Sequence, residues 1–252
     1  MKGGRWVRGV DALVKELGMV VQPKQVLLIY GQPMVGKSTL AAILARWWAQ
    51  GHDSNVVVLG LETAYGEEEY VEFISQYLKG VKFRIVTFDT VQNAMSSVLR
   101  RAYMGLVHGA GAVILDSVSA FGDALASDLV AKMGTVEQRV VAARVSPIIK
   151  YVVMGVREVA VRRGGIGIVI AHAGSTAGTS KYRGLTDWRP SLSIKAGHYV
   201  SYELLLEVWE KKPEYRTLTI VAARNRPWLD GNSVLMRFAE NDVEVYTKGE
   251  EK

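Results

Sequence analysis

The sequence predicts an α/β fold in which a mostly parallel sheet is flanked by helices and extended by antiparallel strands near its C-terminus. Two observations carry this prediction. Up to about residue 172, short apolar runs alternate with helical patterns, and this alternation is typical of a parallel sheet covered on both faces. After about residue 200, only strand-like runs separated by short turns follow. Such runs are typical of antiparallel strands added at one edge of a sheet.

The expected elements follow from the period of the apolar residues and from the turn residues between them. The expected strands of the first part are 25–30, 55–62, 82–88, 112–116 and 165–172. The expected helices are 38–51, 66–80, 90–108 and 135–163. The expected strands of the last part are 202–210, 215–223, 233–239 and 242–246. We expect Pro147 to kink the last helix, because its ring cannot continue the backbone hydrogen bonds.

Length, charge and composition limit the classes of protein. The chain has 252 residues, no cysteine and a formal net charge of +6. The length suits one large domain or two small ones; because the sequence shows no linker, we expect one domain over residues 1–252, with residues 1–24 as a lead-in. The missing cysteine excludes disulfides, thiolate catalysis and zinc–thiolate sites. The apolar runs are too short to span a membrane, so we expect a cytoplasmic protein without membrane association. The positive charge favours a polyanionic partner.

The stretch "GQPMVGKST" has the form G-x-x-x-x-G-K-S/T and lies between an expected strand and an expected helix. Backbone N–H groups of such a loop, together with the helix N-terminus, bind nucleotide phosphates. We therefore expect ATP and Mg²⁺ as cofactors. Lys37 would contact the β- and γ-phosphates, and the Ser38 hydroxyl would bind Mg²⁺. The expected nucleotide-binding residues are Gly31, Gln32, Pro33, Met34, Val35, Gly36, Lys37, Ser38 and Thr39.

Two carboxylates end apolar strands and are candidates for the chemistry. Asp116 ends "AVILD" and can hold the water shell of Mg²⁺; the alternative is an aspartate that caps a turn. Glu62 ends "VVVLGLE" and can orient the water that attacks the γ-phosphate. The alternative for Glu62 is a surface charge at a strand end.

Over nearly its whole length the chain resembles the ATPase core of the RecA/RadA superfamily. "GVDALVKELG" (9–18) resembles the segment before the phosphate loop in archaeal RadA, RadB and KaiC. The other similar segments are "LETAYGEEE" (61–69), "VILDSVSA" (113–120), "VIAHAG" (169–174) and "AARNRPWLDGNSVLMRF" (222–238). The last resembles the C-terminal hairpin of RadB-like proteins and hexameric helicases. The resemblance implies a RecA-like P-loop NTPase fold and ATP hydrolysis, with Glu62 as a catalytic residue.

The resemblance also implies roles for two further residues. His172 would sense the γ-phosphate; the alternative is a hydrogen-bonded histidine under a loop. Arg224 would enter the ATP site of a neighbouring subunit, which implies a homo-oligomer or a recombinase partner; the alternative is an exposed hairpin arginine. Ala64 and Ala222 depart from the family pattern, at a glycine and a lysine position respectively. No N-terminal DNA-binding domain or Phe-x-x-Ala segment precedes the core, so we expect a stand-alone paralogue.

Residues 174–200 show no strand or helix period, and we expect them to form a loop that binds single-stranded DNA. Tyr182, Trp188 and Tyr199 are interleaved with four cations and one acid, Asp187. Cations neutralise phosphates and aromatic rings stack on bases. In RecA-like recombinases the equivalent loop contacts DNA. The alternative is a solvated loop whose aromatic side chains fold back onto the domain. The expected DNA-binding residues are Lys181, Arg183, Trp188, Arg189 and Lys195.

Together these features predict an ATPase that couples Mg-ATP hydrolysis to single-stranded DNA binding in recombination or repair. Two alternatives stay open. One is a KaiC-like or helicase-core ATPase that works as a ring. The other is a DNA-binding accessory protein with negligible turnover.

Overall fold

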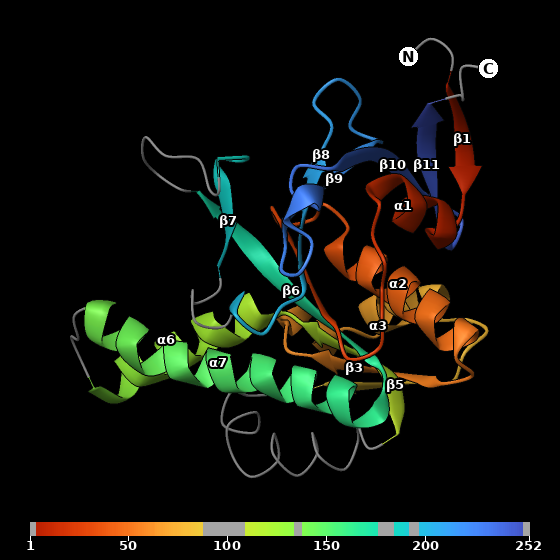
Figure 1. Cartoon of the computed structure of the whole chain (residues 1–252). Coiled ribbons are helices and arrows are strands. Elements are labelled where there is room, and N and C mark those ends of the chain that lie inside the picture. The colour runs from red at the N-terminus through yellow and green to blue at the C-terminus, as the bar shows by residue number, and fades with distance from the viewer. Residues whose placement is uncertain (1–3, 88–108, 134–137, 176–183, 192–196, 249–252) are drawn as a thin grey trace.

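The computed structural model describes residues 4–87, 109–133, 138–175, 184–191 and 197–248. These residues form an 11-stranded sheet with helices on both faces (Figure 1). The α/β fold predicted from the sequence is therefore confirmed. None of the helices in these ranges is long and apolar enough to cross a membrane.

Six neighbouring strands of the sheet run parallel, in the order β8-β2-β6-β5-β3-β4. They are β2 (Val26–Gly31), β3 (Asn55–Gly60), β4 (Phe83–Thr87), β5 (Ala110–Asp116), β6 (Ile166–Ser175) and β8 (Tyr202–Val208). Their carboxyl ends lie along one edge of the sheet, which is where ligands bind in open α/β folds.

The antiparallel part of the sheet begins one strand later than the sequence suggested. β8 pairs in parallel with β2, with Tyr202 opposite Leu27, because the chain after β6 returns to the start of β2 before β8 begins. From β8 outward, β9, β10, β11 and β1 then pair antiparallel. These strands are β1 (Gly4–Arg8), β9 (Arg216–Ala223), β10 (Ser233–Ala239) and β11 (Asp242–Lys248). The lead-in thus contains a strand that the sequence analysis did not anticipate.

Helices cover the two faces of the sheet and create two apolar cores (Figure 1). The first core lies under α1 (Val10–Leu17), α2 (Lys37–Gly51) and α3 (Glu68–Tyr77), and the second under α6 (Val118–Met133) and α7 (Gln138–Arg163). Successive strand residues alternate between the cores, as the two-residue period of a strand requires. Leu27 and Ile29 belong to the first core, whereas Leu28 and Tyr30 belong to the second.

Several boundaries differ from the expected ones. α6 was not expected, whereas α7 falls within the expected helix 135–163 and contains Pro147. The expected helix 66–80 is present as the shorter α3 (Glu68–Tyr77), and a 3-10 turn, η1 (Thr63–Gly66), precedes it. The expected loop 174–200 contains the end of β6 and a short strand, β7 (Trp188–Pro190), which pairs with it. The expected helix 90–108 lies outside the described residues.

Candidate nucleotide site

The phosphate loop joins β2 to α2, as the motif requires. Gly36 caps the N-terminus of α2 with φ of 98°, and Lys37 is the first helical residue. A Cβ atom on Gly31 would lie 2.2 Å from the carbonyl oxygen of Leu206, and one on Gly36 would lie 2.4 Å from the Phe238 ring. Both positions therefore need glycine. The loop also contains Met34, whose φ of 62° is costly for any residue with a side chain.

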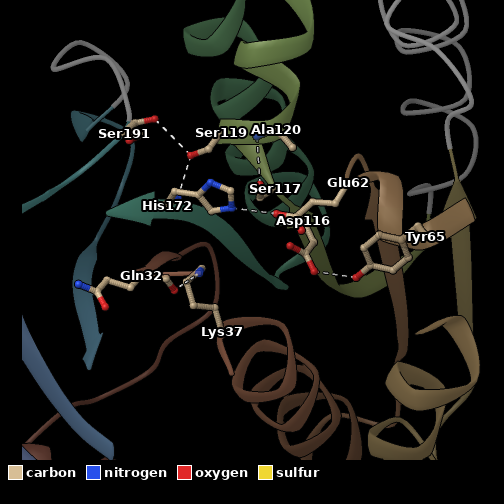
Figure 2. Close-up of polar contacts among 10 residues, drawn as sticks. All are labelled: Gln32, Lys37, Glu62, Tyr65, Asp116, Ser117, Ser119, Ala120, His172 and Ser191. Atoms are coloured by element: carbon tan, nitrogen blue, oxygen red, sulfur yellow. Dashed lines mark hydrogen bonds and ion pairs between the residues drawn. The ribbon is translucent and has the colours of Figure 1, made fainter. Parts of the chain in front are cut away.

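Lys37 is oriented by the loop itself. Its Nζ donates a hydrogen bond of 2.7 Å to the carbonyl oxygen of Gln32, and the side chain is buried (Figure 2). Burial lowers the pKa of Lys37, while the carboxylates of Glu62 and Asp116 act in the opposite direction. A cation held beside the loop amides at a helix N-terminus forms an anion-binding site. The rest of the loop presents Gln32, Pro33 and Met34 to solvent and buries Val35 and Thr39.

Asp116 ends β5 beside the phosphate loop and is buried. Its Oδ2 accepts a 2.7 Å hydrogen bond from the Tyr65 hydroxyl (Figure 2). Its Oδ1 is also buried and has no hydrogen-bond partner in the described part of the chain. Burial, and secondly the charge of Glu62, raise the pKa of Asp116 to about 6. A carboxylate that keeps one oxygen unpaired in a buried position is costly, and such an oxygen suits a bound cation or its water.

Glu62 and His172 come together although they are far apart in sequence. Glu62 follows β3 by two residues, and His172 lies in β6 opposite Gly31 of the phosphate loop. The His172 Nε2 and Glu62 Oε1 atoms are 3.2 Å apart (Figure 2). The backbone N–H of His172 donates to Ser119 Oγ at 2.8 Å. The predicted catalytic carboxylate and the predicted phosphate sensor therefore form one hydrogen-bonded pair.

Sequence reasoning missed several residues around this site. Two of them, Tyr65 and Tyr70, pack edge to face with ring centroids 5.0 Å apart. Ser38, which the sequence did predict, is close enough to Asp116 and Tyr70 to lower the pKa of both. Burial and secondly Asp116 nevertheless raise the pKa of Tyr70 to about 12. Tyr65 lies in η1 and Tyr70 in α3, and the local sequence pattern of neither element gives a signal for a role at the site.

Arg216 is a second group that the sequence did not reveal. Its Nε donates to the carbonyl oxygen of Val35 at 2.8 Å, and its guanidinium also bonds the carbonyls of Tyr215 and Pro213. Burial lowers the pKa of Arg216. The first residue of β9 thus connects the turn before it to the phosphate loop.

Arg224 lies far from the phosphate loop of its own chain. Its backbone N–H donates to the Ser201 carbonyl, and the Ser201 N–H donates to the carbonyl of Val26, the first residue of β2. Gly31 is the last residue of that strand. Arg224 therefore lies at the end of the sheet opposite to the candidate site, beside the start of β2, and is exposed.

The predicted DNA-binding segment is described only in part. Trp188 and Arg189 lie in β7, opposite Ser175 and Gly174, and Arg189 is exposed. Trp188 is half-buried and packs on the second core. Lys181, Arg183 and Lys195 lie outside the described residues, and DNA binding by this segment stays a prediction.

Tyr199 does fold back onto the domain. Its ring packs on the second core, with Lys150 Nζ 5.9 Å and Arg157 Cζ 5.8 Å from its centroid. Both cations belong to α7, so a cation–π contact holds the end of the segment against that helix.

The residues present fit a nucleotide with its cation. The glycine loop, the Lys37 amine and the helix N-terminus provide a site for phosphates, and the unpaired Asp116 Oδ1 suits the water shell of a metal. Within the described ranges, no three acidic or histidine side chains converge to hold a metal by themselves. The phosphates would therefore have to supply part of the coordination of any cation here.

Comparisons with protein-family models and with curated protein sequences give no match. Comparison with solved structures does give matches. A RadB recombinase is similar at 19% identity and a TM-score of 0.61, over 92% of this chain and 96% of that one. A KaiC-like protein from the hyperthermophilic archaeon Pyrococcus horikoshii OT3 is similar at 20% identity and a TM-score of 0.53, over 89% of this chain and 90% of that one. At these identities the likeness establishes the fold alone: this chain shares the fold of these two proteins.

Proposed function

We propose that this protein is an ATPase of the RecA/RadA type that couples Mg-ATP hydrolysis to the binding of single-stranded DNA in recombination or repair. The observation that carries the proposal is the convergence of Lys37, Glu62, Asp116 and His172 at one edge of the parallel strands (Figure 2). A phosphate loop alone indicates a nucleotide site. A carboxylate and a histidine bonded to each other beside it favour hydrolysis.

Each group at this edge has a task in the proposed reaction. Lys37 exchanges its bond to the Gln32 carbonyl for bonds to the β- and γ-phosphates. Ser38 and Asp116 would hold a magnesium complex, which would supply positive charge next to the phosphates. Glu62 orients a water for attack on the γ-phosphate, a role that typically contributes about 10²–10⁴-fold in rate.

The bond between Glu62 and His172 also offers a route from the nucleotide to the DNA-binding segment. A γ-phosphate would compete with Glu62 for the His172 ring. The carbonyl oxygen of His172 accepts a 2.8 Å hydrogen bond from the Ser191 N–H, directly after β7. A movement of His172 therefore acts on the strand that carries Trp188 and Arg189, which is how a phosphate contact can order or release a binding segment.

The exposed position of Arg224 supports an assembly in which copies of the chain share ATP sites. The six residues of β2 are joined by five steps of about 3.3 Å, so the two ends of this strand lie roughly 17 Å apart. An arginine beyond the far end acts on a nucleotide only when that nucleotide belongs to another subunit or to a recombinase partner.

The test is the rate of ATP turnover with and without single-stranded DNA. We expect Lys37→Ala to lose ATP binding, and Glu62→Gln to retain binding but lose most turnover. DNA-stimulated turnover in the wild type supports the proposed function. DNA-independent turnover in a ring favours the KaiC-like alternative, and ATP-dependent DNA binding without turnover favours the accessory protein.

A second experiment tests whether residues 174–200 bind single-stranded DNA. Replacing Lys181, Arg183 and Arg189 with alanine should weaken DNA binding and reduce its log–log salt slope by about 0.7 per lost phosphate contact, without affecting ATP affinity. Arg84→Ala, an exposed arginine on β4, is the matched control. A triple variant with wild-type affinity and slope would place the DNA site elsewhere.

A further inference from the structure

Tyr65 is bonded to the one buried carboxylate that the proposed function assigns to the cation. Its side chain is 3% exposed, and its hydroxyl donates to Asp116 Oδ2 at 2.7 Å (Figure 2). The other oxygen, Oδ1, has no partner among the residues that the structure describes. The chain thus occupies one carboxylate oxygen and leaves the other open.

The phenol ring of Tyr65 is fixed from two sides. A Cβ atom on Gly60 would lie 2.4 Å from the ring, so the ring rests directly on the backbone at the end of β3. On another side the ring meets Tyr70 at an interplanar angle of 87°. Gly60 is also the register partner of Asp116. A donor that is fixed on the neighbouring strand defines the side-chain rotamer of the carboxylate that it bonds.

We propose that Tyr65 is a positioning residue of the nucleotide site, which holds Asp116 Oδ2 so that Oδ1 is presented to the cation that accompanies the nucleotide. The inference rests on the proposed function, because it assigns a partner to Asp116 in the same site. Tyr65 itself does not touch the nucleotide or the cation. It acts only through the orientation of Asp116.

The physical consequence is a change in cation affinity that a purely structural tyrosine would not produce. Tyr65→Phe removes one oxygen and keeps the ring that packs on Gly60 and Tyr70. Asp116 Oδ2 then loses the 2.7 Å hydrogen bond from the Tyr65 hydroxyl, and the carboxylate can rotate away from the cation. Loss of a hydrogen bond to a metal-binding group typically reduces metal affinity about 10–100-fold.

The experiment measures Mn²⁺ binding to the protein–ADP complex from the electron paramagnetic resonance signal of free Mn²⁺. We expect Tyr65→Phe to raise the Mn²⁺ concentration for half-occupancy at least about 10-fold. ADP affinity in EDTA, measured by calorimetry, should stay at the wild-type value and thus verify the fold of the variant. Tyr77→Phe is the matched control, because Tyr77 belongs to the same aromatic cluster through Phe73 but has no bond to Asp116 in the structure. It should leave both quantities unchanged.

The outcomes separate this inference from the proposed function. If the Tyr65→Phe variant binds Mn²⁺ at the same concentration for half-occupancy as the wild type, the inference is overturned and the proposed function is not affected. A lower Mn²⁺ requirement in the variant would also overturn it, since Tyr65 would then compete with the cation. Absence of any cation-dependent ADP binding in the wild type would overturn the inference and the proposed function together.

Discussion

Replacing Asp116 with asparagine should stabilise the nucleotide-free protein above about pH 6 and remove its cation-dependent nucleotide binding. Asp116 is 1% exposed. Burial, and secondly the charge of Glu62, raise its pKa from 3.8 to about 6. Because the pKa in the folded state exceeds the ordinary value, the folded protein binds this proton more tightly than the unfolded chain does. Ionisation of Asp116 therefore lowers the free energy of unfolding.

The size of the effect follows from the two pKa values. They differ by about 2, and each unit corresponds to about 1.4 kcal/mol, so the ionised carboxylate costs about 3 kcal/mol. The cost is absent below about pH 4, grows as the pH rises through about 6, and is constant at higher pH. Asparagine has nearly the same shape and does not ionise. The stability gain of Asp116→Asn should follow this curve.

The assay is urea unfolding in EDTA between pH 4.5 and pH 8, with the variant compared with the wild type at each pH. Titrations of groups that do not interact with Asp116 cancel in the difference. Asp123→Asn serves as the control, because Asp123 is an exposed aspartate on α6 and should give no pH-dependent gain. If the difference between Asp116→Asn and the wild type is the same at pH 4.5 and pH 8, the burial argument is refuted.

Two further predictions concern the phosphate loop. Met34 is 98% exposed with φ of 62°, so Met34→Gly should raise the free energy of unfolding by about 0.5–1 kcal/mol, since the left-handed conformation costs a residue with a side chain more than the glycine entropy costs. Urea unfolding measures it, and a loss of stability would contradict the strain argument. Arg216→Ala should weaken ATP binding about 10-fold in calorimetry, because the Val35 carbonyl loses a charged donor. Arg216→Lys should restore part of the affinity, and wild-type affinity in Arg216→Ala would show that the loop is held without this bond.

The parts of the site that the sequence predicted depend on local order. The phosphate loop is one continuous segment between a strand and a helix, so its spacing alone indicates its geometry. Asp116 and His172 belong to neighbouring parallel strands of the sheet, and Glu62 lies two residues after the end of a third, β3. Parallel strands end at the same edge, so their convergence followed from topology.

The parts that the sequence did not predict depend on contacts between distant segments. Tyr65 is 51 residues from Asp116, and Arg216 is 181 residues from Val35. Neither pairing changes the apolar period of its own segment. The same holds for the direction of β8, which depends on its pairing with β2, a strand far away in the sequence, and not on the composition of β8. α6 was missed although its buried residues, Val118, Phe121 and Leu125, have helical spacing.

In the proposed ATPase, the two ends of the sheet carry residues with different functions. At the carboxyl edge, Glu62 and His172 bond to each other, so the group that orients water and the group that reports the phosphate respond to the same event. At the opposite end, Arg224 is exposed beside the start of β2. If the proposed function holds, one chain alone can bind ATP and pass a change at His172 on to β7, but cannot bring Arg224 to its own phosphates. From this separation we infer that oligomer formation controls the rate of hydrolysis more strongly than it controls the affinity for ATP.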